Sequence, residues 1–249
     1  LDKDDEIAAV ISVRDFDEEV DLFFCSRKGL VKRTRLGDYR NIRTSGLRAY
    51  DCAEGDQLLT VRKTRTEQHV LITTRAGKCI RFQGINESGE LEVRHMGRVA
   101  RGVRGIKLKE SDEIAGLEML ENDAEMLLLT VTENGYGKRT AIEKYRVQGR
   151  GGQGVINMVV DERNGRVVGS VQVHDGDQLM MMTNTGRVIK IPVTNIRETQ
   201  SRAAKGVRLM RVEKDERIVS VTRVVEQEDD LEEVPVELEG ETLEISTEE

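Results

Sequence analysis

A hairpin-like segment occurs four times in this chain, and the repetition limits the possible folds more than any other feature. Each copy has an apolar run, a short turn that ends in glycine, and a second run, which is the pattern of a β-hairpin. The copies are LFFCSRKGLVKRT (22–34), VLITTRAGKCIRF (70–82), LLLTVTENGYGKRT (127–140) and LMMMTNTGRVIKI (179–191). The turn glycines are Gly29, Gly77, Gly135 and Gly186. A tight turn at this position needs a positive φ, which glycine adopts freely.

Two further positions agree in all four copies. Three residues before the glycine stands a hydroxyl residue, and four residues after it stands a basic one. The hydroxyl residues are Ser26, Thr74, Thr132 and Thr183, and the basic ones are Arg33, Arg81, Arg139 and Lys190. Four agreements in a fixed register indicate a true internal repeat.

A second element follows each hairpin, after a loop of variable length. Its expected anchors are Gly46, Gly105, Gly154 and Gly206, and the first three precede the next turn glycine by 31, 30 and 32 residues. The second copy has extra residues at 84–98, which indicates a surface loop. A period of about 50 residues with four short strands and no helix is typical of a propeller-like blade. We therefore expect an all-β fold over residues 1–224, with four four-stranded blades. Residues 6–13 match the last strand of a repeat (217–224) and are expected to form an orphan strand.

The stretch GRGGQG (149–154) spells the G-x-G-x-x-G pattern of dinucleotide-binding loops. Such a loop must leave a strand and open a helix, whose N-terminus meets the pyrophosphate. Here a β-branched run with an Asn164-Gly165 turn follows instead. The glycines therefore belong to the repeat, and we expect no nucleotide site.

Composition excludes several other classes of protein. No apolar run is long enough for a transmembrane helix, and the N-terminus lacks the pattern of a signal peptide. The chain opens on charged residues without an initiator Met, so we expect a piece of a longer protein. The use of cysteine predicts a cytoplasmic location. Cys25, Cys52 and Cys79 are far apart, and the three histidines have no ligand spacing. Neither a disulfide framework nor a metal site is expected.

Charge is distributed unevenly along the chain. The net charge is −7, but residues 225–249 hold 12 of the 46 acidic residues and no Lys or Arg. The remaining 34 acidic and 39 basic residues leave residues 1–224 at +5. We interpret 225–249 as a disordered acidic tail, because its apolar content is too low for packing. The tail could compete with phosphate for a basic surface.

Three segments resemble the C-terminal domain of bacterial DNA gyrase A, part of a type II DNA topoisomerase. They are NGYGKRTAIEKYRVQGRGGQGVINM, ERNGRVVGSVQV and GVRGIKL, and the resemblance extends over about residues 1–224. It implies a six-bladed β-pinwheel with strand exchange between blades, in which duplex DNA wraps around a basic rim. It also implies gyrase B and the rest of gyrase A as partners in a heterotetramer. The parent enzyme supercoils DNA negatively with ATP, and ATP and Mg²⁺ would bind other domains.

The chain departs from the family pattern in two ways. The family's diagnostic box in its first blade is QRRGGKG, and the nearest match here is QGRGGQG (148–154), with Gly149 and Gln153 replacing basic residues. Four hairpins stand where the family has six blades, so the first blade is expected upstream of residue 1. None of the four tyrosines has the context of a strand-cleaving residue. We therefore expect no catalytic activity, cofactor or small-molecule substrate for this chain.

DNA wrapping needs cations that recur along a curved surface, without base reading. The predicted phosphate contacts are Arg33, Arg81, Arg139 and Lys190, with Lys32 and Lys138 one residue earlier. A second predicted row is Arg48, Lys107 and Arg208, two residues after their anchors, with Arg150 standing in for Ile156. Weaker candidates are the turn residues Lys28, Arg75, Lys78 and Arg187. The alternative is that these charges only protect exposed strand edges from pairing.

Two other functions stay open at this point. One is the equivalent domain of topoisomerase IV, which resembles this domain and tends to have fewer blades. The other is a protein-binding β-propeller with no role on nucleic acid. The second predicts apolar and aromatic residues on the surface, and aromatic residues make up only 3% of the chain.

Overall fold

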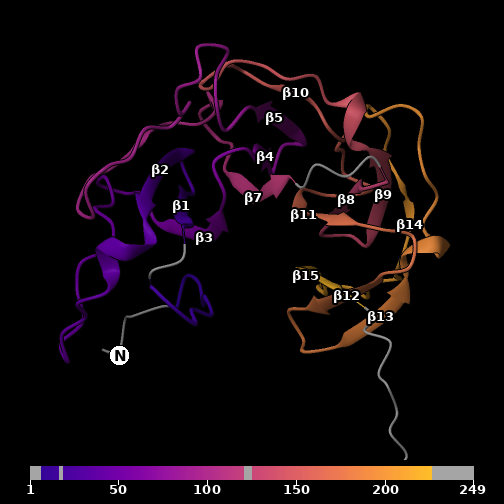
Figure 1. Cartoon of the computed structure of the whole chain (residues 1–249). Helices are drawn as coiled ribbons and strands as arrows, with labels where there is room; N and C mark the ends of the chain where they lie inside the picture. The colour runs from indigo at the N-terminus through magenta and orange to yellow at the C-terminus, as the bar shows by residue number, and fades with distance from the viewer. Residues whose placement is uncertain (1–6, 17–18, 121–124, 226–249) are drawn as a thin grey trace, which may run out of the picture.

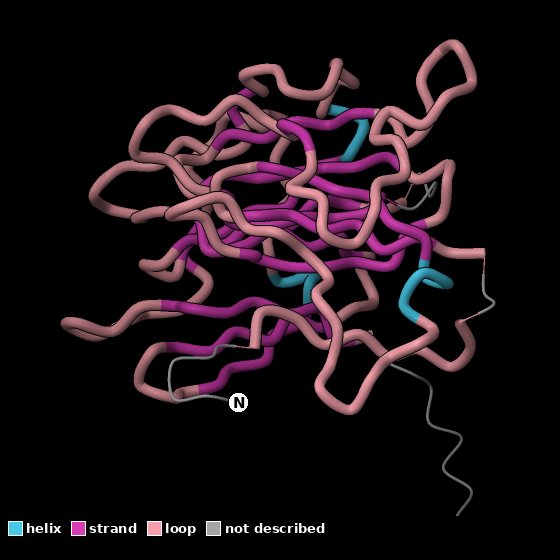
Figure 2. The backbone as a smooth tube through the Cα atoms, turned by 90° about the vertical axis from the view of Figure 1, so that its left-hand side faces the viewer, coloured by secondary structure: helices cyan, strands magenta, loops and turns pink. Residues whose placement is uncertain are grey.

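The computed structural model describes residues 7–16, 19–120 and 125–225. Four antiparallel sheets follow one another along an arc, in the order of the chain (Figure 1). Turned by 90°, the strands of neighbouring sheets lie in layers, with connecting loops at both ends (Figure 2). The helical content of the described residues is three short 3₁₀ turns, Leu36–Tyr39, Ile142–Lys144 and Val193–Asn195. The predicted all-β, propeller-like class is confirmed.

Each blade is built on one of the four hairpins predicted from the repeat. The hairpins are β1 (Asp21–Ser26) with β2 (Leu30–Arg35), β4 (His69–Thr74) with β5 (Lys78–Phe82), β8 (Leu127–Thr132) with β9 (Tyr136–Ala141), and β12 (Gln178–Thr183) with β13 (Val188–Pro192). All four turn glycines have φ between +79° and +83°. The repeated hydroxyl closes three of the turns, because the Oγ of Ser26, Thr74 and Thr183 accepts a backbone N–H four residues on.

A third strand of each blade pairs with the first strand of its hairpin and lies on the inside of the arc. These inner strands are β3 (Leu58–Thr64), β7 (Ile114–Leu120), β11 (Val167–Val173) and β15 (Ile218–Val224). Together they line one cleft of about 250 Å³. Apolar residues from the hairpins and inner strands of neighbouring blades share core clusters, so the blades pack as a continuous array.

The outermost strand of a blade comes from the following repeat. The short strands β6 (Val103–Arg104), β10 (Val155–Ile156) and β14 (Val207–Arg208) pair with β2, β5 and β9 of the blade before. This is the strand exchange that the resemblance implied. In the described part of the chain β13 receives no such strand, so the fourth blade has three strands rather than the expected four.

The expected orphan strand is absent from the described residues 7–13. This segment has no strand pairing, although Ile11 and Val13 pack against the core of the first blade. Residue 6 and most of the acidic tail (226–249) lie outside the described residues.

The predicted anchor glycine of the second repeat, Gly105, is wrong, because Gly102 holds the equivalent position three residues earlier. A Cβ on Gly102, Gly154 or Gly206 would lie 2.4–2.6 Å from a backbone carbonyl oxygen of the preceding blade, and all three have positive φ. Gly105 has no positive φ and does not make this approach. The sequence GVRGIKL offers two glycines. A Cβ at Gly105 would meet side-chain atoms of Ile72 and Val31, whereas a Cβ at Gly102 would meet backbone in a left-handed conformation, so Gly102 is the equivalent anchor.

We expect Gly102→Ala to destabilise the fold by about 2 kcal/mol or more. The left-handed conformation alone costs about 1–2 kcal/mol for an L-residue, and the new Cβ would lie 2.4 Å from the carbonyl oxygen of Val31. Gly97→Ala is the matched control, because a Cβ at Gly97 meets nothing within 4 Å. Denaturant unfolding of both variants measures the difference. Equal stability would show that the exchanged strand tolerates a shift.

Candidate nucleic-acid interface

The first predicted row of cations is largely buried. Lys32 and Lys138 are fully buried, and Arg33 and Arg139 are 2% and 9% exposed. Arg81 is half-buried, and Lys190 is exposed. The prediction that Lys32, Arg33, Lys138 and Arg139 contact phosphate is therefore corrected, because DNA cannot reach these side chains in this fold.

The row instead joins each blade to the next. The backbone carbonyls of Arg33, Arg81 and Arg139 accept hydrogen bonds of 2.8 Å from Met96, Gln148 and Thr199 of the following repeat. The guanidinium of Arg81 also donates to the carbonyls of Ile142 and Tyr145, and that of Arg139 donates to Ile196. Lys190 holds the same position in the fourth blade, after which no further blade follows in the described residues. The fixed register thus reflects a requirement of the fold.

Ion pairs complete the environment of this row. Arg33 Nε lies 2.6 Å from Asp21 Oδ2, and His95 Nε2 lies 2.9 Å from the other oxygen of the same carboxylate. Arg139 pairs with Asp175. These carboxylates satisfy the charge of guanidiniums that burial removes from water.

The buried lysines have structural partners of their own. Lys32 Nζ donates to the carbonyl oxygen of Ala49 at 2.6 Å and lies 4.5 Å from the centre of the Phe24 ring. Lys138 Nζ donates to Thr140 Oγ1 at 2.7 Å. Burial lowers the pKa of both lysines to about 8.

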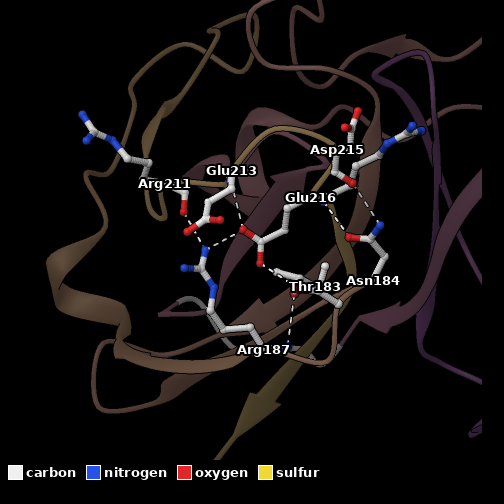
Figure 3. Close-up of polar contacts among 9 residues, drawn as sticks. Thr183, Asn184, Arg187, Arg211, Glu213, Asp215 and Glu216 are labelled. Carbon is white, nitrogen blue, oxygen red and sulfur yellow. Dashed lines mark hydrogen bonds and ion pairs between the residues drawn. The ribbon is translucent and has the colours of Figure 1, made fainter.

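The turn residue Arg187, a weaker candidate, is also engaged within the protein (Figure 3). Its Nη2 donates to the carbonyl oxygen of Arg211 at 2.7 Å and lies 2.8 Å from Glu216 Oε2. Glu216 is 7% exposed and also accepts from the backbone N–H of Glu213. These contacts lower the pKa of Glu216 below its usual range, and the hydrogen bond from the N–H of Glu213 has the largest effect. The Arg187–Glu216 ion pair thus holds the turn between β12 and β13 against the segment before β15.

Glu216→Gln is expected to lower the melting temperature near pH 7. The carboxyl of Glu216 has a lower pKa in the folded than in the unfolded protein, so its ionised form stabilises the fold above the ordinary value of 4.5. That contribution is lost as the pH falls through the folded-state pKa. The difference from wild type should therefore shrink in acid. Melting curves from pH 7 to pH 3 measure it, with the exposed Glu110→Gln as the control. A difference that stays constant with pH would contradict this role.

The cations of the second predicted row, Arg48, Lys107 and Arg208, are exposed, but Lys107 does not hold the position equivalent to the other two. Strand pairing places Arg104, not Lys107, in line with Arg208, because β6 and β14 occupy equivalent positions. Ile156 of β10 holds the same place in the third repeat. Arg48 follows Gly46 by the same two residues and is also exposed. The structural row is thus Arg48, Arg104 and Arg208, with Lys107 exposed nearby.

Arg150 is half-buried in the GRGGQG loop, which packs on the segment before it. Its guanidinium donates to the carbonyl oxygens of Arg104 (2.7 Å) and Glu92 (3.3 Å). The N–H of Gly151 donates to Gly105, and the carbonyl oxygen of Gly152 accepts from Lys107. The loop leads into β10 and not into a helix, so the nucleotide-site pattern has no structural basis here.

The outer connecting segments carry an excess of positive charge that the single-residue repeat did not reveal. Four of them, 40–48, 94–109, 144–150 and 202–211, hold 16 of the 39 Lys and Arg residues and no Asp or Glu. They run along the outside of the arc, away from the inner strands (Figure 1). Most of these cations are exposed, including Arg43, Arg98 and Lys109. The signal that would have found them is the local absence of acidic residues.

Arg43, Arg48 and Arg98 line a cleft of about 870 Å³ at the outside of the first blade. Asp38 also lines it, and the carbonyl oxygen of Asp38 accepts from Arg98 Nη1 at 3.3 Å. Arg48 and Arg101 share the carboxylate of Asp51. A surface of this kind can hold an anionic backbone through many exposed guanidiniums.

Other kinds of site find little support in the described residues. No group of three or more His, Cys, Asp or Glu residues there could hold a metal ion. The three cysteines are free thiols, of which Cys25 and Cys79 are buried. No helix within the described ranges is long and apolar enough to cross a membrane.

Comparison with known proteins agrees with this architecture. A family model described as the DNA gyrase C-terminal domain, beta-propeller, matches residues 21–65, 68–121, 127–174 and 177–224, one match for each blade. The DNA gyrase A protein of Salmonella typhimurium is 41% identical over 230 residues, and that of Escherichia coli 40%. The corresponding protein of Staphylococcus epidermidis is 39% identical over 231 residues. Each alignment covers 92% of this chain and 25% of the relative, so the chain spans about a quarter of their length.

Two solved structures have the same fold. The C-terminal domain of DNA topoisomerase IV gives a TM-score of 0.81 at 27% identity, covering 90% of this chain and 68% of that one. The C-terminal domain of DNA gyrase A gives a TM-score of 0.79 at 22% identity, covering 90% and 72%. The second likeness shows the fold alone. With a family model that matches every blade, the chain belongs to the family of C-terminal β-propeller domains of DNA gyrase A.

Proposed function

We propose that this chain binds duplex DNA without sequence specificity and bends it around the outside of the arc. The observation that carries the proposal is the set of four acid-free basic segments, 40–48, 94–109, 144–150 and 202–211, on the outer side of successive blades. Charge of one sign that recurs from blade to blade follows a curved path. A polyanion of uniform charge can follow the same path.

Physical requirements of wrapping favour this arrangement. Bending a 20–30 base-pair site by 40–90° costs about 1–6 kcal/mol, so many contacts must act together. Each cation that neutralises a phosphate releases condensed counterions, which supplies affinity without base recognition. Arginine predominates in these segments, and its planar fork of donors suits phosphate oxygens.

The role in the whole enzyme extends the proposal beyond this chain. We infer an accessory domain of gyrase A that presents wrapped DNA during ATP-dependent negative supercoiling. The partners would then be gyrase B and the rest of gyrase A, on which ATP and Mg²⁺ would act. The chain itself would contribute binding and bending and no chemical step.

The likeness to the topoisomerase IV domain supports a second candidate, the same surface in that enzyme. The curated relatives near 40% identity are gyrase proteins, which favours gyrase. Supercoiling tests separate the two candidates. A parent enzyme that introduces negative supercoils would be gyrase, and one that only relaxes or decatenates DNA would be topoisomerase IV.

A salt series on duplexes of unrelated sequence tests DNA binding directly. We expect the logarithm of the association constant to fall linearly with the logarithm of salt concentration, by about 0.9 for each phosphate contacted. Affinity should be the same for different sequences of one length. Absence of binding at low salt, or binding confined to one sequence, would contradict the proposal. If the chain bound a protein specifically and no DNA, it would instead be a protein-binding β-propeller.

A further inference from the structure

Tyr136, Arg163 and Arg208 meet at the outer edge of the third blade. Arg208 Nη2 donates to the hydroxyl oxygen of Tyr136 at 2.8 Å, and Arg163 Nε donates to the same oxygen at 3.2 Å. The two guanidinium carbons lie 5.4 Å and 4.9 Å from the centre of the Tyr136 ring. Tyr136 is 3% exposed, whereas both arginines are exposed. The phenol thus lies beneath two guanidiniums that face solvent.

Hydrogen bonding leaves one donor of this group available. A guanidinium can only donate, so the hydroxyl oxygen of Tyr136 acts as the acceptor for both arginines. Its own hydrogen has no acceptor among the described residues. Because Tyr136 is buried and both arginines are exposed, an anion from solvent would meet the remaining N–H groups of the arginines.

Electrostatics at this position favour an anion. Within the described ranges no carboxylate lies at ion-pair distance from Arg163 or Arg208. Asp161, on the same turn as Arg163, pairs with Lys205 at 2.6 Å, and its charge is the smallest of the effects on the pKa of Arg163. Hydrogen bonds from Arg163 and then Arg208 lower the pKa of Tyr136, because donors to the phenol oxygen favour its ionised form.

The three residues are held by the backbone before any ligand arrives. Tyr136 and Arg208 face each other in the pairing of β9 with β14. Arg163 sits on a turn that ends at Gly165, with φ of +73°, and its carbonyl oxygen accepts from the side chain of Asn134 at 3.2 Å. A preformed site loses less conformational entropy on binding.

The group occurs in one blade only. The residue after the turn glycine is Tyr136 in the third blade, whereas the other blades have Leu30, Lys78 and Arg187. A feature that all blades need for folding would be repeated. The common fold of the blades therefore does not require this group.

We propose that Tyr136, Arg163 and Arg208 form a discrete binding site for one phosphate group of the DNA backbone. The site rests on the proposed DNA-binding function and adds a fixed contact to a surface of otherwise independent cations. Both exposed arginines would donate to phosphate oxygens, and the buried Tyr136 would hold the two guanidiniums in position through its hydroxyl oxygen. Such a contact holds the path of the DNA at the third blade.

The test uses the full chain with ¹³C-labelled tyrosine, whose four signals are assigned with Tyr→Phe variants. We expect the Tyr136 ring signal to shift on titration with duplex DNA. Tyr136→Phe, which keeps the ring and removes the hydroxyl, should weaken DNA binding roughly tenfold, as for a lost hydrogen bond to a charged group. Tyr39→Phe is the matched control, because the Tyr39 hydroxyl donates to the carbonyl of Ala49 and, among the described residues, makes no hydrogen bond to an arginine.

Different failures can be told apart. If wild type binds DNA while the Tyr136 signal stays unmoved and Tyr136→Phe keeps full affinity, the site is refuted and the DNA-binding proposal stands. If wild type binds no duplex at all, both are refuted. A parallel titration with inorganic phosphate completes the test. A Tyr136 signal that responds to inorganic phosphate but not to DNA would overturn the assignment to the DNA backbone.

Discussion

Replacing Arg33 with leucine is expected to destabilise the protein by about 3 kcal/mol or more, the usual cost of breaking a buried ion pair. Arg33 is 2% exposed, and its removal leaves the carboxylate of Asp21 with His95 alone. For a protein of this size, about 2–4 °C of melting temperature corresponds to 1 kcal/mol. A fall of at least roughly 6 °C should therefore be measured by circular dichroism or calorimetry.

Arg35→Leu is the matched control for this prediction. Arg35 lies two residues further along β2 and is exposed, so the same change of chemistry should cost at most about 0.5 kcal/mol. The comparison also separates a structural role from a DNA contact. If Arg33→Leu melted like wild type and lost DNA affinity, the phosphate contact first predicted for this residue would be correct, and the inter-blade role would be wrong.

Replacing Arg48, Arg104 and Arg208 together with glutamine is expected to abolish most DNA binding and to leave the fold intact. If each arginine contacts one phosphate, the salt slope should fall in magnitude by about 2.7. At 0.1 M salt the same relation gives roughly a 500-fold loss of affinity. All three residues are exposed, so the loss of stability should be limited to the hydrogen bond from Arg208 to Tyr136, about 1.5 kcal/mol.

An equal change of charge away from the outer surface provides the control for this triple variant. Arg14, Arg35 and Arg65 are exposed and lie outside the four basic segments, and their triple replacement by glutamine should retain most of the affinity. Fluorescence anisotropy with one labelled duplex measures both variants across the salt series. Equal losses in the two triple variants would mean that net charge alone, and not the outer surface, determines binding.

Local features of the fold could be predicted from the sequence because they depend on neighbouring residues. The hairpins and their turn glycines follow from alternation of apolar runs and from the need for positive φ, and all four have the expected geometry. Strand exchange does not follow from local pattern. β6, β10 and β14 are two residues long, and their partners lie in the preceding repeat, so this feature came only from the family resemblance.

The roles of the basic residues could be predicted less well. A cation in fixed register is equally consistent with a ligand contact and with a contact between blades, and only the packing of one blade on the next distinguishes them. Arg33 and Arg139 belong to the second class. Arg98 was missed because the wrong anchor, Gly105, hid its register: it stands four residues before Gly102, as Arg150 stands before Gly154 and Arg202 before Gly206. Arg43 has no such repeated position, and only the acid-free segment around it marks it as part of the basic surface. Arg163 and Arg208 meet on Tyr136 only in three dimensions.

Bending of DNA by the outer surface is the central claim, and one measurement tests it most directly. A duplex much shorter than the persistence length of about 150 base pairs is nearly straight when free, so dyes on its two ends give little energy transfer. We predict that saturating wild-type protein brings the ends together and raises the transfer, and that the Arg48, Arg104 and Arg208 triple variant does not do so even at concentrations where it binds. Wild-type protein that saturates the duplex without any rise in transfer would contradict the account.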